Sequence, residues 1–202
     1  MSHTMSIPIR SLASRHTDLT QRVILDAALE LLELAPVHEL SARAVAKHAG
    51  ISERTIFRYF ANRDDFLAAV AAATSDRLQV PAEPTSLEDL LAFPQTIYTC
   101  FEDKIALTKA ALHSELYDHI READGERRGA AVRSLVDLLA PGMTEQERKL
   151  ATANIRYYLV ATTWHYYRFY FELSLEESIQ CARMAIVQTL LGIGVKDPAL
   201  GG

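Results

Sequence analysis

Two arginines in this chain have a spacing that suits chemistry with a polyanion. They lie in the segment GISERTIFRYF, residues 50–60, which begins with a glycine. On a helix that turns by about 100° per residue, Arg54 and Arg58 stack one turn apart. Ile56 and Phe60 share the opposite face. Because a guanidinium fork binds guanine or phosphate through paired hydrogen bonds, the spacing predicts an exposed cationic face backed by an apolar anchor.

The local charge is consistent with this interpretation. The formal net charge of the 202-residue chain is −5 at pH 7. Residues 43–63 nevertheless carry four arginines and one lysine against a single glutamate. A basic patch on an acidic protein is typical of a nucleic-acid-binding surface, although an ordinary solvated face has the same composition. The geometry of the helices therefore has to decide between the two.

Two short helices with their own caps are expected to position this segment. Ser41 is placed to cap the first helix and Ser52 the second, and Gly50 can adopt the positive φ that ends the first. The four-residue link 49–52 suits a helix-turn-helix over about residues 41–60. In such a unit the second helix enters the major groove of DNA, and its positive N-terminus is open to a phosphate.

Helical periodicity dominates the whole chain, and no segment alternates as a strand does, so we expect an all-α fold of about nine helices. An apolar stripe predicts a first helix from Thr20, which Pro36 stops soon afterwards. Asn62 is placed to start a fourth helix that continues to about Gln79. The DNA-binding unit is thus a three-helix domain with a longer helix leading away from it.

Prolines in the segment VPAEPT divide the chain into a DNA-binding domain, residues 18–79, and a helical ligand-binding and dimerisation domain, residues 80–202. In the second domain, serine or threonine precedes an acidic residue by three positions at several sites, which is the spacing of a capping box. We expect helices to begin after Ser86, Thr144 and Ser174, and loops at Phe93-Pro94, around Gly125 and at Pro141-Gly142.

The composition favours a folded cytoplasmic protein. Hydrophobic residues make up 49% of the chain, but no run of about 18 apolar residues predicts a membrane span, and no secretory signal is present. The opening MSHTM resembles an expression scar, with Met5 as an alternative start, so residues 1–17 receive no structural weight. Arg10 and Arg15 remain candidates for a basic arm. Cys100 and Cys181 are interpreted as buried thiols.

Residues 20–70 resemble the N-terminal domain of the tetracycline-repressor (TetR) family of one-component bacterial regulators. The resemblance depends on the Ile24/Ala27/Ala28 stripe, the Ser41 cap, the 49–52 link and the Thr55-Ile56-Phe57 core. The chain departs from the family pattern at Ala35-Pro36, where many members have glycine, and at Arg54, a position that is often small. By position, DNA contacts are implied for Arg43, Glu53, Arg54, Thr55, Phe57, Arg58, Tyr59 and Arg63, and the capping residues Ser41 and Ser52 complete the predicted interface.

The resemblance implies a homodimeric transcriptional repressor that binds a pseudo-palindromic double-stranded DNA operator and is released by a small-molecule effector. The expected helix from Glu145 to about Phe171 is apolar on several faces, so it needs partners on several sides. The last helix carries two apolar stripes, of which the second is Met184, Val187 and Leu191. One stripe can face the subunit core and the other a second subunit. The predicted dimer interface consists of Tyr166, Tyr170, Ile179, Ala182, Ile186 and Leu190.

An effector pocket is expected in the second domain, lined by side chains that combine apolar bulk with polar ends. Each of these side chains would pack equally well in a core or an interface. An aromatic lining with few cations favours an uncharged or hydrophobic ligand. The candidate lining residues are Phe101, His113, Tyr117, Tyr158, Trp164 and His165.

Two rival functions are open to simple tests. One is a helical adaptor that kept the helix-turn-helix and lost DNA binding. The other is an enzyme, for which the sequence offers no HExxH, CxxC, phosphate-binding glycine loop or serine elbow. Glu115 and His119 are spaced to share a metal, but without a third ligand an exposed helical ion pair is the preferred interpretation. We therefore expect no catalytic residue, no metal and no cofactor.

Overall fold

The computed structural model describes residues 12–34 and 40–196, and within these residues every regular element is helical. The expected all-α class is confirmed. The elements outnumber the expected nine because the long helix expected from Glu145 to Phe171 is divided into three elements. In chain order they are α1 Leu12–Leu34, α2 Ala42–His48, α3 Glu53–Tyr59, α4 Arg63–Leu78, α5 Leu87–Asp103, α6 Ile105–His113, α7 Leu116–Leu139, α8 Glu145–Tyr157, α9 Ala161–His165, the π-helical turn η1 Tyr166–Tyr170 and α10 Leu175–Gly192.

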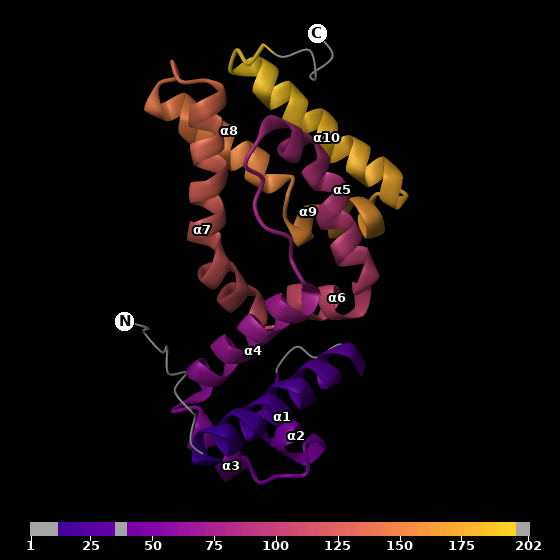
Figure 1. Ribbon diagram of the computed structural model, residues 1–202. Coiled ribbons are helices and arrows are strands. Elements are labelled where there is room, and N and C mark those ends of the chain that lie inside the picture. The colour runs from indigo at the N-terminus through magenta and orange to yellow at the C-terminus, as the bar shows by residue number, and fades with distance from the viewer. Residues whose placement is uncertain (1–11, 35–39, 197–202) are drawn as a thin grey trace, which may run out of the picture.

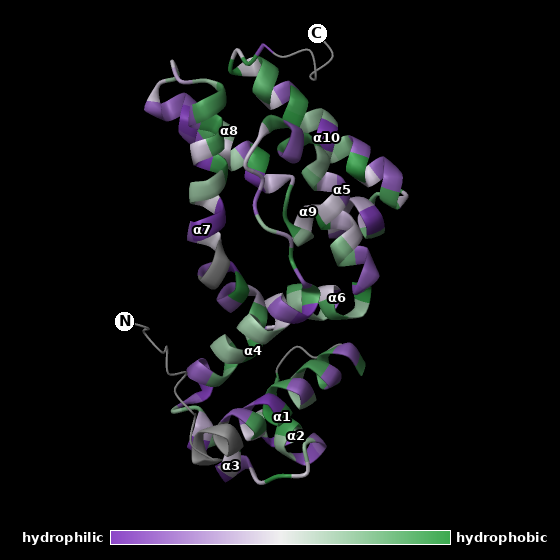
Figure 2. Ribbon diagram, in the orientation of Figure 1, coloured by the Kyte–Doolittle hydropathy of each residue, from purple (hydrophilic) through white to green (hydrophobic). Residues whose placement is uncertain are grey.

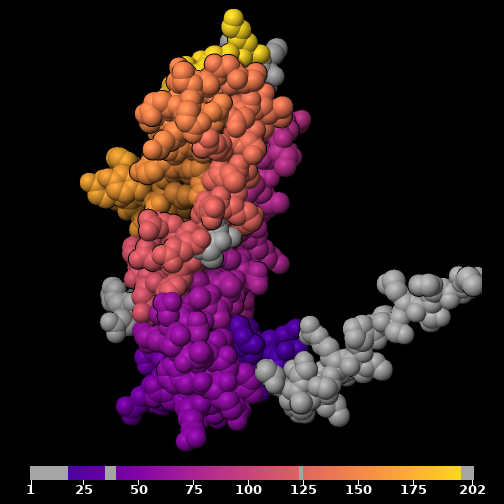
Figure 3. Space-filling view, turned by 90° about the vertical axis from the view of Figure 1, so that its left-hand side faces the viewer, coloured from indigo at the N-terminus to yellow at the C-terminus, as the bar shows by residue number. Residues whose placement is uncertain are grey.

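The helices form two lobes along an elongated molecule (Figures 1 and 3). Helices α1–α3 make the lower lobe, and α4 leads out of it towards the rest of the chain (Figure 1). Helix α4 packs against α1 below and against α7 and α6 above. The upper lobe contains α5 and α7–α10. Helix α4 is thus the covalent and packing link between the two lobes.

Apolar side chains from α1, α2 and α3 close the core of the lower lobe. Ile24, Val45 and Ile56 are fully buried, one from each of α1, α2 and α3. Leu107 of α6 and Leu116 of α7 join the same cluster. The packing therefore continues from the lower lobe into the first helices of the upper one. Helices α6 and α7 therefore share a core with the lower lobe.

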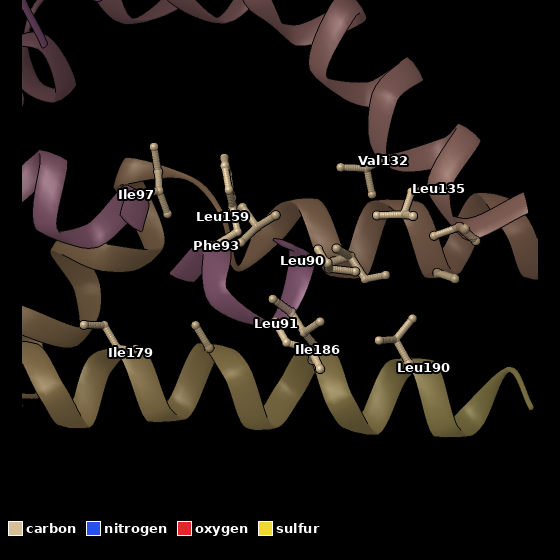
Figure 4. Close-up of a cluster of buried hydrophobic side chains, with 14 of the residues drawn as sticks. Leu90, Leu91, Phe93, Ile97, Val132, Leu135, Leu159, Ile179, Ile186 and Leu190 are labelled. Atoms are coloured by element: carbon tan, nitrogen blue, oxygen red, sulfur yellow. The ribbon is translucent and has the colours of Figure 1, made fainter. Parts of the chain in front are cut away.

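The upper lobe has a separate core in which α10 packs along α5 (Figure 4). Ile179, Ile186 and Leu190 point from α10 towards Leu91 and its neighbours on α5. The ribbon coloured by hydropathy shows hydrophobic and hydrophilic residues alternating along α10 (Figure 2). Burying each such side chain stabilises the fold by about 1.5–3 kcal/mol, which fixes this stripe inside the subunit.

Two of the three expected loops are wrong. Pro94 lies inside α5 and Gly125 lies inside α7. Pro94 is itself buried, and the core-facing side chains of Leu90 and Ile97 hold the helix on either side of it. This burial outweighs a lost backbone hydrogen bond. The turn at Pro141-Gly142 is confirmed.

All three predicted caps in the second domain are confirmed. The side chains of Ser86, Thr144 and Ser174 accept hydrogen bonds from backbone N–H groups three residues later. At Thr144 and Ser174 the glutamate three positions on reaches back to the cap, which completes a capping box. The first helix begins at Leu12, earlier than Thr20, and ends at Leu34. The expected stop at Pro36 lies outside the described residues, as do Arg10 and the last six residues.

The long helix expected from Glu145 to Phe171 is interrupted. Helix α8 ends at Tyr157, and Val160 is extended, with φ −110° and ψ 154°. The carbonyls released at this break have partners, because the Tyr98 hydroxyl donates to the Tyr158 carbonyl at 2.8 Å and the Thr163 hydroxyl donates to that of Tyr157. The break turns α9 and η1 away from the direction of α8.

Candidate functional site

The helix-turn-helix is closed by the caps that its sequence predicts. Ser41 accepts from the Ala44 N–H at 3.1 Å, and Ser52 accepts from the Thr55 N–H at 3.2 Å. Gly50 has a φ of 68°. Next to it, the Ile51 N–H donates to the Ala46 carbonyl at 2.9 Å, as in a Schellman turn. These local bonds fix the angle at which α3 leaves α2.

Helix α3 presents opposite faces to the core and to solvent, as expected. Ile56 is fully buried, and Phe60 packs edge-on against Phe66 with ring centroids 5.4 Å apart. Arg54 and Arg58 are exposed on the other side. Phe57 is 40% exposed, so it belongs to the outer surface rather than to the core. The outer face of α3 thus combines two cations with an aromatic ring.

Several cations of this surface have no competing partner inside the protein. Within the described part of the chain, Arg43 and Arg54 are exposed and make no hydrogen bond or ion pair. Arg58 donates to the Tyr59 hydroxyl at 3.4 Å and lies over its ring at 5.2 Å. Hydrogen bonds with Thr20 and then with Arg58 lower the pKa of Tyr59. Arg58 is therefore steered along the outer surface while its charge stays exposed to solvent.

Arg63 differs from the other predicted DNA contacts. Its Nη2 donates to Oε1 of Glu115 at 2.6 Å, and the same oxygen accepts from the Leu40 N–H at 2.9 Å. His119 lies 3.6 Å from Asp64. The expected ion pair between Glu115 and His119 is wrong, because both side chains cross from α7 to the lower lobe. Glu115, at the start of α7, thus bridges Arg63 of α4 and Leu40, which precedes α2.

Comparison with known proteins identifies the lower lobe. The profile of the bacterial regulatory proteins of the tetR family matches residues 24–70. These residues form a helix-turn-helix domain of the tetR type. They include the whole of α2 and α3, which supports a role in DNA-binding transcription regulation.

The likeness of fold extends over both lobes. A tetR-family transcriptional regulator from Streptomyces coelicolor superposes with a TM-score of 0.64 at 15% sequence identity, covering 91% of this chain and 86% of that one. No curated protein sequence matches this chain significantly. No helix within the described ranges is both long enough and apolar enough to cross a bilayer.

A cavity lies where α4–α9 meet. Its empty space, counted together with the open solvent at its mouth, is about 740 Å³. Phe101 and Tyr117, two of the predicted ligand residues, line it. Three arginines missed by sequence reasoning also line it, namely Arg121, Arg128 and Arg156. The expected lining with few cations is therefore wrong.

The other four predicted ligand residues lie outside this lining. Trp164 is fully buried, and its indole N–H donates to Glu102 at 3.1 Å. His113 and His165 face each other, with their Nε2 atoms 3.4 Å apart. Burial, followed by the neighbouring His113 and Lys109, lowers the pKa of His165. Tyr158 is partly buried against the core of the upper lobe, and its ring packs edge-on against that of Tyr157.

The structure corrects four residues of the predicted dimer interface. Ile179, Ala182, Ile186 and Leu190 are buried in their own subunit and cannot meet a second one. The physical reason is that α5 covers this stripe of α10. Tyr166 and Tyr170 are exposed and stacked, with ring centroids 4.5 Å apart, and their place in an interface stays a prediction.

A different apolar surface remains exposed on α8 and α10. It consists of Leu150 and Tyr157 on α8 and of Met184 and Leu191 on α10. The two helices are joined at their surface, because Asn154 of α8 donates to the Thr189 hydroxyl of α10 at 3.2 Å. Met184 and Leu191 belong to the second stripe that the sequence shows. We call these four side chains the α8/α10 surface.

Proposed function

We propose that this tetR-family regulator is a homodimeric repressor that binds a pseudo-palindromic operator and is released by a small molecule bound in the cavity. The observation that carries the proposal is the geometry of α3 in the helix-turn-helix that the tetR-family model matches. Arg54 and Arg58 are exposed on its outer face, and Ile56 is buried on the opposite face. Arg54 and Arg58 are at a spacing that allows two guanidinium forks to read neighbouring base edges in a major groove.

Phosphate contacts would come from residues beside this face. Arg43 is exposed on α2, the helix that crosses the backbone in such a motif. Ser41 and Ser52 hold the N-termini of α2 and α3, and Thr55 lies beside the Ser52 hydroxyl at 2.8 Å. Glu53 and Phe57 lie on the exposed side of α3, beside a base edge or a thymine methyl in this arrangement. Phosphate contacts position the helix, and base contacts specify the sequence.

The dimer is proposed to form through the α8/α10 surface. A contiguous apolar surface on two adjacent helices is typical of a four-helix interface between identical subunits. Two-fold symmetry then presents two copies of α3 to half-sites about 34 Å apart or a multiple of that distance. Because each half-site contributes its own binding free energy, a dimer binds such an operator far more tightly than one subunit does.

Release by a ligand follows from linkage between the cavity and the DNA-binding lobe. Helix α7 contributes Tyr117 to the cavity and Glu115 to the bridge with Arg63 and Leu40. Leu78, the last residue of α4, lines the same cavity, whereas Arg63 is the first residue of that helix. A ligand that favours another setting of α7 against α4 therefore changes the spacing of the two α3 helices. The reciprocal coupling in such systems is typically about 1–3 kcal/mol.

Fluorescence anisotropy with DNA from the chain's own upstream region tests the proposal. We expect selective binding whose affinity falls steeply as salt rises. Arg58→Ala should cost about 1–3 kcal/mol on that fragment and relax the base preference. Arg133→Ala is the matched control, because Arg133 is exposed on α7 and pairs with Glu145 at 2.7 Å, away from α3. Equal losses from both variants, or no selectivity in the unmodified chain, would favour an adaptor that has lost DNA binding.

A further inference from the structure

We propose that His113 and His165 form a zinc-binding site between α6 and α9. The two histidines are 52 positions apart in the chain, and each is the last residue of its helix. Neither belongs to the predicted DNA contacts or to the cavity lining, so the site goes beyond the proposed function and does not depend on it. It departs from the expectation of no metal, which considers only short spacings along the sequence.

The distance between the two imidazoles suits a shared tetrahedral metal ion. Their Nε2 atoms are 3.4 Å apart while the ring centroids are 4.9 Å apart, so these nitrogens lie on the facing sides of the rings. Zinc binds an imidazole nitrogen at about 2.0–2.1 Å, which places two ligands at a tetrahedral angle about 3.3–3.4 Å from each other. An ordinary N–H···O hydrogen bond is shorter, at about 2.7–3.2 Å. The pair therefore has the separation of two zinc ligands without any movement of α6 or α9.

Aromatic contacts hold the His165 ring in place. It packs against Phe169 of η1 with centroids 5.0 Å apart, and Trp164 meets it edge-on at 6.2 Å. Lys109, one turn before His113 on α6, places its Nζ 3.7 Å from the Phe169 centroid. Two contacts thus join α6 to the α9–η1 segment side by side, a cation–π pair and the histidine pair. A ring that is already packed loses little freedom when it binds a metal.

Both imidazoles are available to an ion from solvent. Among the residues that the structure describes, neither histidine makes a hydrogen bond or an ion pair with a third residue. His113 is exposed and His165 is partly buried. Zinc binds the neutral form of imidazole, and burial, followed by His113 and Lys109, lowers the pKa of His165, which favours that form.

The chemistry of the pair selects zinc over the common hard cations. Imidazole nitrogen suits zinc, whereas Mg²⁺ and Ca²⁺ prefer oxygen ligands. No group of three or more His, Cys, Asp or Glu side chains in the described part of the chain could hold a metal, so water would complete the coordination of an open site. Leu107 and Ala110 of α6 belong to the core of the lower lobe. A zinc ion would therefore cross-link a helix of that core to α9 in the upper lobe.

Isothermal titration of the untagged full chain with zinc chloride, in a buffer without phosphate, tests the site. We expect zinc binding that weakens at least about tenfold in His113→Gln and equally in His165→Gln, because each variant removes one of two ligands. His48→Gln is the matched control, since His48 lies on α2 and pairs with Glu30 at 2.8 Å. Its zinc affinity should equal that of the unmodified chain. Magnesium chloride should not compete with zinc.

Thermal unfolding followed by circular dichroism gives a second readout. A ligand that binds only the folded chain stabilises it, so saturating zinc should raise the Tm of the unmodified chain and of His48→Gln but not that of the two site variants. The same spectra check that these variants are folded without zinc, and His113→Ala and His165→Ala replace any that are not.

Three results would overturn the site. They are a chain that neither binds zinc nor gains Tm from it, an unchanged zinc affinity in both site variants, and a loss of affinity in only one of the two. None of these measurements uses DNA. The zinc site can therefore fail while the proposed function stands, and the reverse also holds.

Discussion

Replacing Glu115 tests how the two lobes are joined. Oε1 of Glu115 accepts two hydrogen bonds, from the Leu40 N–H and from Nη2 of Arg63. Glu115→Ala removes both, whereas Glu115→Gln keeps an amide oxygen that can still accept from Leu40. The pair of variants therefore separates the backbone hydrogen bond from the ion pair.

The stability losses expected for Glu115→Ala and Glu115→Gln differ enough to be distinguished by measurement. A partly buried N–H that loses its acceptor costs about 1–3 kcal/mol, and an exposed ion pair contributes about 0.2–1 kcal/mol. The Arg63 side chain is 45% exposed, so the lower range applies to its pair with Glu115. We expect Glu115→Ala to lower the free energy of unfolding by about 1.5–3 kcal/mol, and Glu115→Gln by about 0.2–1 kcal/mol. For a chain of this size these losses correspond to about 3–12 °C and at most about 4 °C in Tm.

Thermal unfolding followed by circular dichroism checks the stability, and salt titrations check the DNA contact. Glu115→Gln frees Arg63, so we expect the slope of log affinity against log salt to steepen by about one. In an Arg63→Ala chain the Glu115→Gln change should have no such effect. Equal losses of Tm in Glu115→Ala and Glu115→Gln would refute the role of the Leu40 bond. An unchanged salt slope would remove Arg63 from the predicted phosphate contacts.

For two further substitutions the structure predicts whether the free energy of unfolding rises or falls. Gln79 caps α4 with a φ of 55°, a left-handed conformation that favours glycine. Gln79→Gly should therefore raise the free energy of unfolding, measured by urea denaturation, by about 0.5–1 kcal/mol. A lower free energy of unfolding in this variant would contradict the left-handed conformation at Gln79. Hydrogen bonds from Arg168 and then from Trp164 lower the pKa of Glu102 from its ordinary value of 4.5. The stability that Glu102 supplies is thus present above pH 4.5 and is lost as pH falls through the lower, folded pKa. Unfolding followed by the fluorescence of the single tryptophan, Trp164, should show a deficit in Glu102→Gln that shrinks in acid, and a deficit independent of pH would contradict this linkage.

The lower lobe could be predicted from sequence because its signals are local. Ser41, Ser52 and Gly50 each act within a few residues, through a cap or a positive φ, and all three behave as expected. The separation of Arg54 and Arg58 from Ile56 depends only on helix geometry. None of these inferences needed knowledge of what the other lobe does.

The upper lobe was harder to predict because distant packing overrides local signals. Pro94 and Gly125 are helix breakers by type, yet both lie inside continuous helices, and in α5 the buried side chains of Leu90 and Ile97 hold the helix on either side of the proline. Conversely, α8 ends at Tyr157 without a proline or glycine, where the Tyr98 hydroxyl donates a hydrogen bond to the Tyr158 carbonyl. Such a break depends on a residue 60 positions away, which no local pattern encodes.

The choice between the two apolar stripes of α10 shows the same limit. Ile186 and Met184 are similar in hydrophobicity and only two positions apart, so the sequence does not say which faces the core. The structure decides because α5 covers Ile186 and leaves Met184 exposed. The arginines of the cavity were missed for a related reason, since Arg156 joins Arg128 only through the packing of α8 on α7. The one local signal was Gly125 between two arginines on a helical face.

Helix α7 gives these separate observations a common physical basis. Arg128 and Glu115 are 13 positions apart on it, which places the cavity arginine and the inter-lobe bridge about 20 Å from each other along one helix. A rigid helix transmits a shift at one end to the other, and the bridge at Glu115 is short, charged and shared between α4 and the entry to α2. Such a bridge tolerates little displacement before its hydrogen bonds weaken. The proposed ligand would therefore contact the helix whose other end carries the bridge to the lower lobe.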